Sequence, residues 1–159
     1  MSAGAQLGAR LREGDLAAAP AVLNLVETRD AHEQVTALLR EVSPAALGGE
    51  ARAHVVGITG PPGAGKSTLL GELVRAWRAD GRSVAVLAVG PSSKISGGSL
   101  LGDRVRIQHD PKDDSILIRS TAAGTRLGGL AEATRDAAQA LSAAFDIVVV
   151  ETVGVGQSE

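Results

Sequence analysis

The sequence predicts an α/β fold in which helices flank a parallel sheet, with a helical extension in front of it. Between residues 54 and 151, short runs of β-branched and other apolar residues alternate with longer helical stretches. Strand–helix–strand units of this kind form right-handed crossovers and a parallel sheet. Aromatic residues make up only 1% of the chain, so Ala, Val, Leu and Ile must build the core. Such a composition suits a sheet that is covered by helices on both faces.

The beginning of the chain has the pattern of an amphipathic helical extension. Gly14 is placed to end a first helix, and Pro20 falls in the first turn of a second, where proline is tolerated. Apolar residues then recur at the spacing of a helix face: Val22, Leu25, Val26, Val35, Leu38, Leu39 and Val42. A Pro- and Gly-containing linker follows. We therefore expect a helical extension over 1–50 and a sheet domain over 51–159.

The elements of the sheet domain follow in a regular order. The pattern predicts strands over 54–59, 83–89, 115–118 and 145–151, and helices over 66–79 and 130–144. The strand over 115–118 is the weakest of these predictions. The strand over 145–151 is apolar enough to need a neighbour on each side and helices on both faces, so we expect the sheet within this chain to be incomplete.

A phosphate-binding loop is predicted between the first strand and its helix. Residues 60–67, GPPGAGKS, satisfy the pattern G-x-x-x-x-G-K-[ST]. The glycines let the backbone curl, so that its N–H groups point at phosphate oxygens near the positive end of the helix. We expect Lys66 to reach the β- and γ-phosphates, Ser67 to ligate Mg²⁺ and Thr68 to touch the α-phosphate. The predicted nucleotide-binding residues are Gly60, Pro61, Pro62, Gly63, Ala64, Gly65, Lys66, Ser67 and Thr68.

The alternative is a Gly- and Pro-rich turn that precedes a helix by chance. It requires the whole pattern and both neighbouring elements to agree by accident, so we favour the phosphate loop. Nothing in the loop distinguishes GTP from ATP.

Acidic residues after other strands are candidates for the metal site. Mg²⁺ beside a phosphate loop is held by an acid at the end of another strand, directly or through water. Glu151 ends the strand over 145–151, and Gly154 follows three residues later, as in the D-x-x-G pattern of nucleotide switches with Glu in place of Asp. Asp103 is a second candidate; its alternative is a solvated or helix-starting aspartate. The Gly- and Ser-rich loop over 89–99 follows a strand, where α/β proteins place ligands.

The composition disfavours several other functions. The chain has no cysteine, which excludes disulfides, thiolate metal sites and a cysteine nucleophile. A net charge of −2 argues against a nucleic-acid partner. No apolar run approaches the roughly 20 residues that span a membrane, and we expect a cytoplasmic protein. The three histidines, His32, His54 and His109, have no spacing typical of metal ligands.

Several stretches together resemble the MeaB/ArgK group of P-loop GTPases, whose human relative is the MMAA protein. They are VVGITGPPGAGKSTL, VAVLAVGPSS, GGSLLGDRVR, RLGGLAEATRDA and VVVETVGVGQSE. The resemblance implies a GTPase that uses Mg²⁺, forms a homodimer and acts as chaperone of an adenosylcobalamin-dependent methylmalonyl-CoA mutase. It implies Lys66, Asp103 and Glu151 as catalytic residues, and Ser67, Asp103 and Glu151 at the metal.

The chain departs from this family pattern in two ways. Gly90 stands where the family has an aspartate in V-D-P-S-S, which removes a carboxylate expected near the metal. The chain also lacks the N-K-x-D motif that recognises guanine and the C-terminal arm that forms the dimer, so we expect it to correspond to the N-terminal part of the family. Two alternatives remain open: a nucleotide-binding module without efficient hydrolysis, and a P-loop kinase of the arginine/ornithine transport type.

Overall fold

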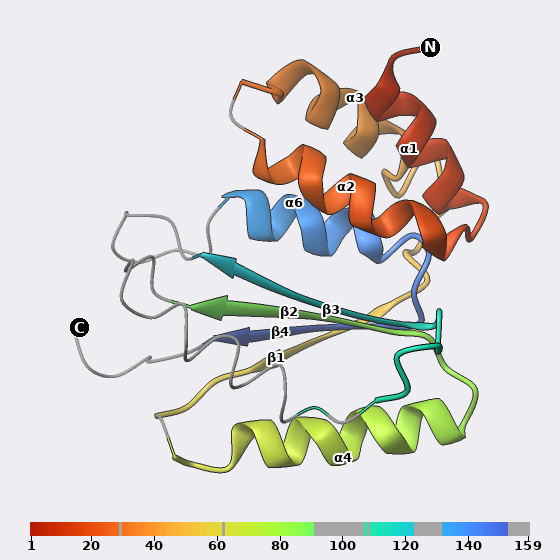
Figure 1. The fold of residues 1–159 in the computed structure, drawn as a ribbon. Coiled ribbons are helices and arrows are strands. Elements are labelled where there is room, and N and C mark those ends of the chain that lie inside the picture. The colour runs from red at the N-terminus through yellow and green to blue at the C-terminus, as the bar shows by residue number, and fades with distance from the viewer. Residues whose placement is uncertain (29, 62, 91–106, 108, 123–131, 153–159) are drawn as a thin grey trace.

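A central sheet separates two layers of helices in the structure (Figure 1), which is a computed structural model. It describes residues 1–28, 30–61, 63–90, 107, 109–122 and 132–152. Helix α4 (Lys66–Ala79) covers one face of the sheet, and α6 (Glu132–Leu141) covers the other. Of the N-terminal helices, α2 (Ala19–Glu27) lies beside α6, and α1 (Ala3–Arg12) and α3 (His32–Glu41) lie further from the sheet. The predicted α/β fold with flanking helices and a helical extension is therefore confirmed.

Within the described residues the sheet has four strands in the order β1-β4-β2-β3, and every pair is parallel. Their bounds are β1 His54–Ile58, β2 Val84–Gly90, β3 Ile116–Ala122 and β4 Ile147–Thr152. Strand β4, the last of these four along the sequence, lies between β1 and β2. On its outer side β1 pairs with no strand in the part of the chain that the structure describes, and Val55 is 58% exposed. The sheet is thus incomplete, as the sequence predicts.

Alternate residues of the central strands face different layers, because successive side chains of a strand point to opposite faces. One apolar cluster joins Leu70 and Val74 of α4 to side chains of β2 and β4: Val84, Val86, Ile147 and Val149. A second cluster joins α6 and the N-terminal helices to the alternate residues of the same strands: Ala85, Leu87, Val148 and Val150. The continuous apolar runs seen in the sequence are therefore explained by burial on both faces.

The N-terminal extension consists of α1 (Ala3–Arg12), a short 3₁₀ helix η1 (Leu16–Ala18), α2 (Ala19–Glu27) and α3 (His32–Glu41). Gly14 has φ +84° just after α1 and ends it as predicted, because a left-handed residue at this position stops the helix. Pro20 lies in the first turn of α2. Leu11, Leu23 and Leu38 are fully buried and belong to the same cluster as α6 and one sheet face. The extension and the sheet share this core, while the domain boundary at residue 50 stays a prediction.

A polar contact fixes the register at the amino ends of β2 and β4. The backbone N–H and the hydroxyl of Ser83 donate to Asp146 Oδ2 at 2.8 and 3.0 Å, and the Asp146 N–H donates to Ser83 Oγ at 3.0 Å. These hydrogen bonds lower the pKa of Asp146 more than its partial burial raises it. Because all four strands are parallel, their carboxyl ends lie together at the opposite end of the sheet from this contact.

Candidate nucleotide-binding site

The predicted phosphate loop connects the carboxyl end of β1 to the start of α4. Strand β1 ends at Ile58 and α4 begins at Lys66, as the sequence predicts within one residue. Gly60, Gly63 and Gly65 have φ values of +149°, +78° and +87°, which favour glycine. The glycines of the motif therefore supply the backbone conformation that curls the loop over the helix N-terminus.

The first turn of α4 directs charge toward this loop. Gly65 precedes the helix and has no side chain to cap it, so the first backbone N–H groups of α4 remain oriented toward the loop. The Lys66 ammonium group donates to the carbonyl oxygens of Gly60 and Pro61 at 2.7 and 2.9 Å. Ser67 is half-buried and Thr68 is exposed on the same turn. Backbone donors, the helix dipole and the lysine together form a site suited to an anionic phosphate.

Glu151 lies beside the loop in the neighbouring strand. It pairs in register with Ile58 of β1 and with Ala88 of β2, and it is only 2% exposed. Because Ile147 and Val149 face α4, period-two alternation places Glu151 on that face as well. The next residue, Thr152, donates its hydroxyl to Thr59 Oγ1 at 3.0 Å, which ties the end of β4 to the start of the loop. A buried carboxylate therefore stands within one strand of the phosphate loop.

The structure brings together only part of the predicted site. Lys66 and Ser67 at the start of α4 and Glu151 near the end of β4 lie at the same carboxyl edge of the sheet, and Gly90 is buried at the end of β2 on that edge. Pro62, Asp103 and Gly154 lie outside the described residues, as does the loop over 91–99. The roles assigned to all these side chains stay predictions. Among the described residues, no group of three or more His, Asp or Glu is placed to hold a metal ion.

Sequence reasoning missed the hydroxyl pair of Thr59 and Thr152. Thr59 ends the strand predicted over 54–59, and Thr152 directly follows the strand predicted over 145–151. A threonine at the carboxyl end of both strands was the one sign of this contact that the sequence offered. Their contact depends on β1 and β4 being neighbours in the sheet, which the order of elements along the chain does not reveal.

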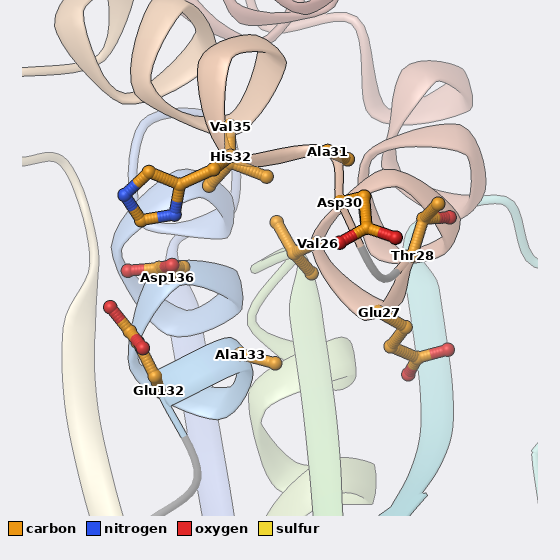
Figure 2. Close-up of a pocket in the computed structure, with 10 residues that line it drawn as sticks. All are labelled: Val26, Glu27, Thr28, Asp30, Ala31, His32, Val35, Glu132, Ala133 and Asp136. Atoms are coloured by element: carbon orange, nitrogen blue, oxygen red, sulfur yellow. The ribbon is translucent and has the colours of Figure 1, made fainter.

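A cavity of about 250 Å³ lies elsewhere, between the α2–α3 connection and α6 (Figure 2). Its lining includes four carboxylates, and His32 lies above Asp136 and Glu132 of α6. Burial, followed by repulsion from Glu132, raises the pKa of Asp136, while His32 and Arg135 lower it less. This negative lining opposes binding of a phosphate. An anionic phosphate therefore fits the loop over 60–67 better than it fits this cavity. The carboxylates of the lining are Glu27, Asp30, Glu132 and Asp136.

The parallel sheet, the curled glycine loop and the lysine at the start of α4 define a protein with the P-loop fold. No helix in the described part of the chain is long and apolar enough to cross a membrane. The family model "Methylmalonyl Co-A mutase-associated GTPase MeaB" matches residues 16–159. The chain belongs to the MeaB family.

Named relatives agree with this assignment. The chain is 48% identical over 151 residues to "Putative GTPase" of Pyrococcus horikoshii, covering 94% of this chain and 46% of that protein. It is 41% identical over 153 residues to GTPase ArgK of Escherichia coli, covering 94% and 45%. It is 45% identical over 105 residues to the mitochondrial methylmalonic aciduria type A homolog of Mus musculus, covering 65% and 25%. The chain thus spans less than half the length of these relatives.

Among solved structures, FtsY from Mycoplasma mycoides has a TM-score of 0.43 and 14% identity, over 96% of this chain and 50% of that one. This likeness is too distant to bear on function.

Proposed function

We propose that this protein binds and hydrolyses GTP and acts as a chaperone of an adenosylcobalamin-dependent methylmalonyl-CoA mutase. The observation that carries the GTP-binding part is the loop from Gly60 to Ser67, with its left-handed glycines, its lysine and the start of α4. The names of the relatives support guanine as the base and hydrolysis as the reaction. The mutase as partner is supported by the family description and by the name of the mouse relative. A cytoplasmic homodimer completes the proposal.

The described residues fit a bound Mg²⁺. Ser67 on α4 and Glu151 on β4 supply hydroxyl and carboxylate oxygens, the ligand type that Mg²⁺ prefers. Mg²⁺ in nucleotide sites is held by one or two protein groups together with phosphates and water, so three protein carboxylates are not needed. Bound there, the ion would neutralise charge on the β- and γ-phosphates. Asp103 completes the proposed metal and catalytic set with Lys66 and Glu151.

The residues of the chain have separable tasks in this proposal. The backbone N–H groups of the loop hold the phosphates, and Lys66 exchanges its contacts with the Gly60 and Pro61 carbonyls for phosphate oxygens. Glu151 acts from a buried position, where a carboxylate interacts strongly with a nearby cation because little water screens it. Gly154 is the proposed backbone contact to the γ-phosphate.

Nucleotide titration of the Lys66→Ala variant tests binding. Loss of charge-assisted hydrogen bonds worth about 1.5–3 kcal/mol predicts a roughly 10- to 100-fold weaker affinity for Mg·GTP in isothermal titration. Lys112→Ala is the matched control, because Lys112 is an exposed lysine far along the chain in the turn before β3. Unchanged binding by Lys66→Ala would refute the site. Equal affinities for GTP and ATP would refute the choice of guanine.

Co-elution tests the partner. An adenosylcobalamin-dependent methylmalonyl-CoA mutase is mixed with the protein in the presence of GTP, GDP or no nucleotide and run on a sizing column. We expect a complex whose amount depends on the nucleotide. Absence of a complex in all three conditions argues against the chaperone role and leaves the GTP site intact.

A nucleotide-binding module that hydrolyses poorly is the second candidate, and Gly90 favours it. This residue is buried at the end of β2, on the edge where Glu151 lies one strand away, and it brings no carboxylate to that edge. Loss of a charged group close to a metal site commonly costs about 10- to 100-fold in affinity or activity. A Gly90→Asp variant that hydrolyses GTP faster than the parent protein, at equal GTP affinity, supports this second candidate. An unchanged rate argues that Gly90 does not limit hydrolysis.

A further inference from the structure

Ser120 carries a buried hydroxyl on the same edge of the sheet as the nucleotide site. It lies on β3, and its Oγ is shielded from solvent without a hydrogen-bond partner among the described residues. A buried polar group without a partner costs folding free energy, so such groups are rare and call for an explanation. A partner that arrives with the ligand is one explanation.

The strand register aligns Ser120 with Glu151. Ser120 pairs with Ala88 of β2, and Ala88 pairs with Glu151 of β4, so the three residues form one row across the sheet. Ile116 and Ile118 pack against the cluster on the α4 face, and alternation therefore places Ser120 on that face too. Ser120 and Glu151 thus stand on the side of the sheet where α4 begins at Lys66, with only the small Ala88 side chain between them.

The distance between the two side chains suits one water molecule. Neighbouring strands lie about 4.8 Å apart, so the Cα atoms of Ser120 and Glu151 are separated by about 9.6 Å across Ala88. The long Glu151 side chain can lean over the alanine methyl and cover part of this distance. A bridging water spans about 5.5 Å with two hydrogen bonds. A carboxylate can accept several hydrogen bonds at once, so other contacts of Glu151 are compatible with this bridge.

We propose that Ser120 is a positioning residue of the metal–nucleotide site: once the nucleotide is bound, its hydroxyl donates through one water molecule to the Glu151 carboxylate across Ala88. The proposal rests on the proposed GTP-binding function. Ser120 does not touch the nucleotide; it holds Glu151 in the orientation that serves the Mg²⁺ ion. Residues that orient metal-side carboxylates typically change metal affinity by about 10-fold or more when their hydrogen bond is removed.

Ser120→Ala tests this role with two readouts. The first is unfolding of the nucleotide-free protein, where we expect no loss of stability because the hydroxyl has no partner to lose among the described residues. The second is the Mg²⁺ dependence of GTP binding, where we expect an affinity for Mg²⁺ lower by about 10-fold. GTP binding in EDTA is expected to match that of the parent protein. Ser120→Thr keeps the hydroxyl and is expected to restore the Mg²⁺ dependence.

Thr134→Ala is the matched control. Thr134 carries the other buried hydroxyl without a partner in the described part of the chain, but it lies on α6, on the opposite face of the sheet. Its removal is expected to leave the Mg²⁺ dependence unchanged. If Ser120→Ala destabilises the free protein and keeps the parent Mg²⁺ dependence, the hydroxyl is structural and the proposal is wrong. Failure of the parent protein to bind Mg·GTP would instead contradict the proposed function.

Discussion

Substituting Gly65 by alanine tests whether nucleotide affinity depends on the backbone conformation of the loop. Gly65 has φ +87°, and a Cβ added there meets no atom of the described residues within 4 Å. The added methyl group therefore causes no clash in the free protein, and the cost comes from the left-handed backbone alone. For a residue other than glycine this conformation costs about 1–2 kcal/mol. In a protein of this size, that corresponds to a melting temperature lower by about 2–8 °C.

Gly81→Ala provides a control with the same backbone strain. Gly81 has φ +76°, its added Cβ also meets no described atom within 4 Å, and it follows the other end of α4. Both variants are expected to lose similar stability. Only Gly65→Ala is expected to lose nucleotide affinity. If the backbone leaves the left-handed conformation, the N–H groups of the loop turn away from the phosphates; if it keeps that conformation, the alanine methyl group lies beside the phosphates.

The assay combines thermal unfolding with nucleotide titration on both variants. We expect comparable melting temperatures for Gly65→Ala and Gly81→Ala, and an affinity for Mg·GTP that is at least about 10-fold weaker in Gly65→Ala, equivalent to about 1.4 kcal/mol. Parent-like affinity in Gly65→Ala would refute the reasoning that this glycine shapes a phosphate site. Equal affinity losses in both variants would show that general destabilisation is responsible.

Two further predictions concern stability. Arg78 donates to both carboxylate oxygens of Asp113 at 2.7 and 3.0 Å, and this contact lowers the Asp113 pKa below its ordinary value of 3.8. The stabilisation is therefore present above pH 3.8 and is lost as the pH falls through the lowered pKa. In urea unfolding we expect Asp113→Asn to be less stable than the parent protein at pH 7, and this stability difference to shrink in acid. A difference that stays constant with pH would contradict the assignment. A Cβ at Gly4 of α1 would lie 1.9 Å from the Gln34 carbonyl oxygen of α3, and we expect Gly4→Ala to cost about 1–3 kcal/mol in urea unfolding. Parent-like stability would show that α1 and α3 separate easily.

The strand β3 shows where sequence reasoning stopped short. The apolar run over 115–118 predicts a short strand, whereas β3 continues to Ala122. The continuation is polar, and its charge is neutralised by tertiary contacts: Arg119 donates to Glu27 at 2.6 Å and to Asn24 at 2.8 Å, both on α2. A partner more than 90 residues away in the chain is invisible to a local pattern. The helix over 66–79, whose apolar face and glycine stop are local, was predicted with its bounds.

In the candidate site, too, local features were predictable from the sequence and contacts between distant segments were not. The conformation of the loop over 60–67 was predictable because a phosphate loop requires a fixed local sequence, and the place of Glu151 because it follows an apolar run; the roles of these residues stay predictions. The row that joins Glu151 to Ser120 was not, because it depends on the sheet order β1-β4-β2-β3, in which neighbours in space are distant in sequence. The same reason hides the Thr59–Thr152 contact.

The contact of Arg119 with α2 bears on what the extension does. Arg119 precedes Ser120 in β3 and points to the opposite face, because neighbouring residues of a strand alternate. One side of this strand is therefore held by Glu27 and Asn24 of the extension, while the other side presents the hydroxyl proposed to position Glu151. The extension also packs in the same buried cluster as Leu87 and Val148 of the sheet, so it helps to hold these strands in place. A change in the extension that shifts β3 is therefore expected to alter the orientation of Ser120, and with it the Mg²⁺ dependence proposed above.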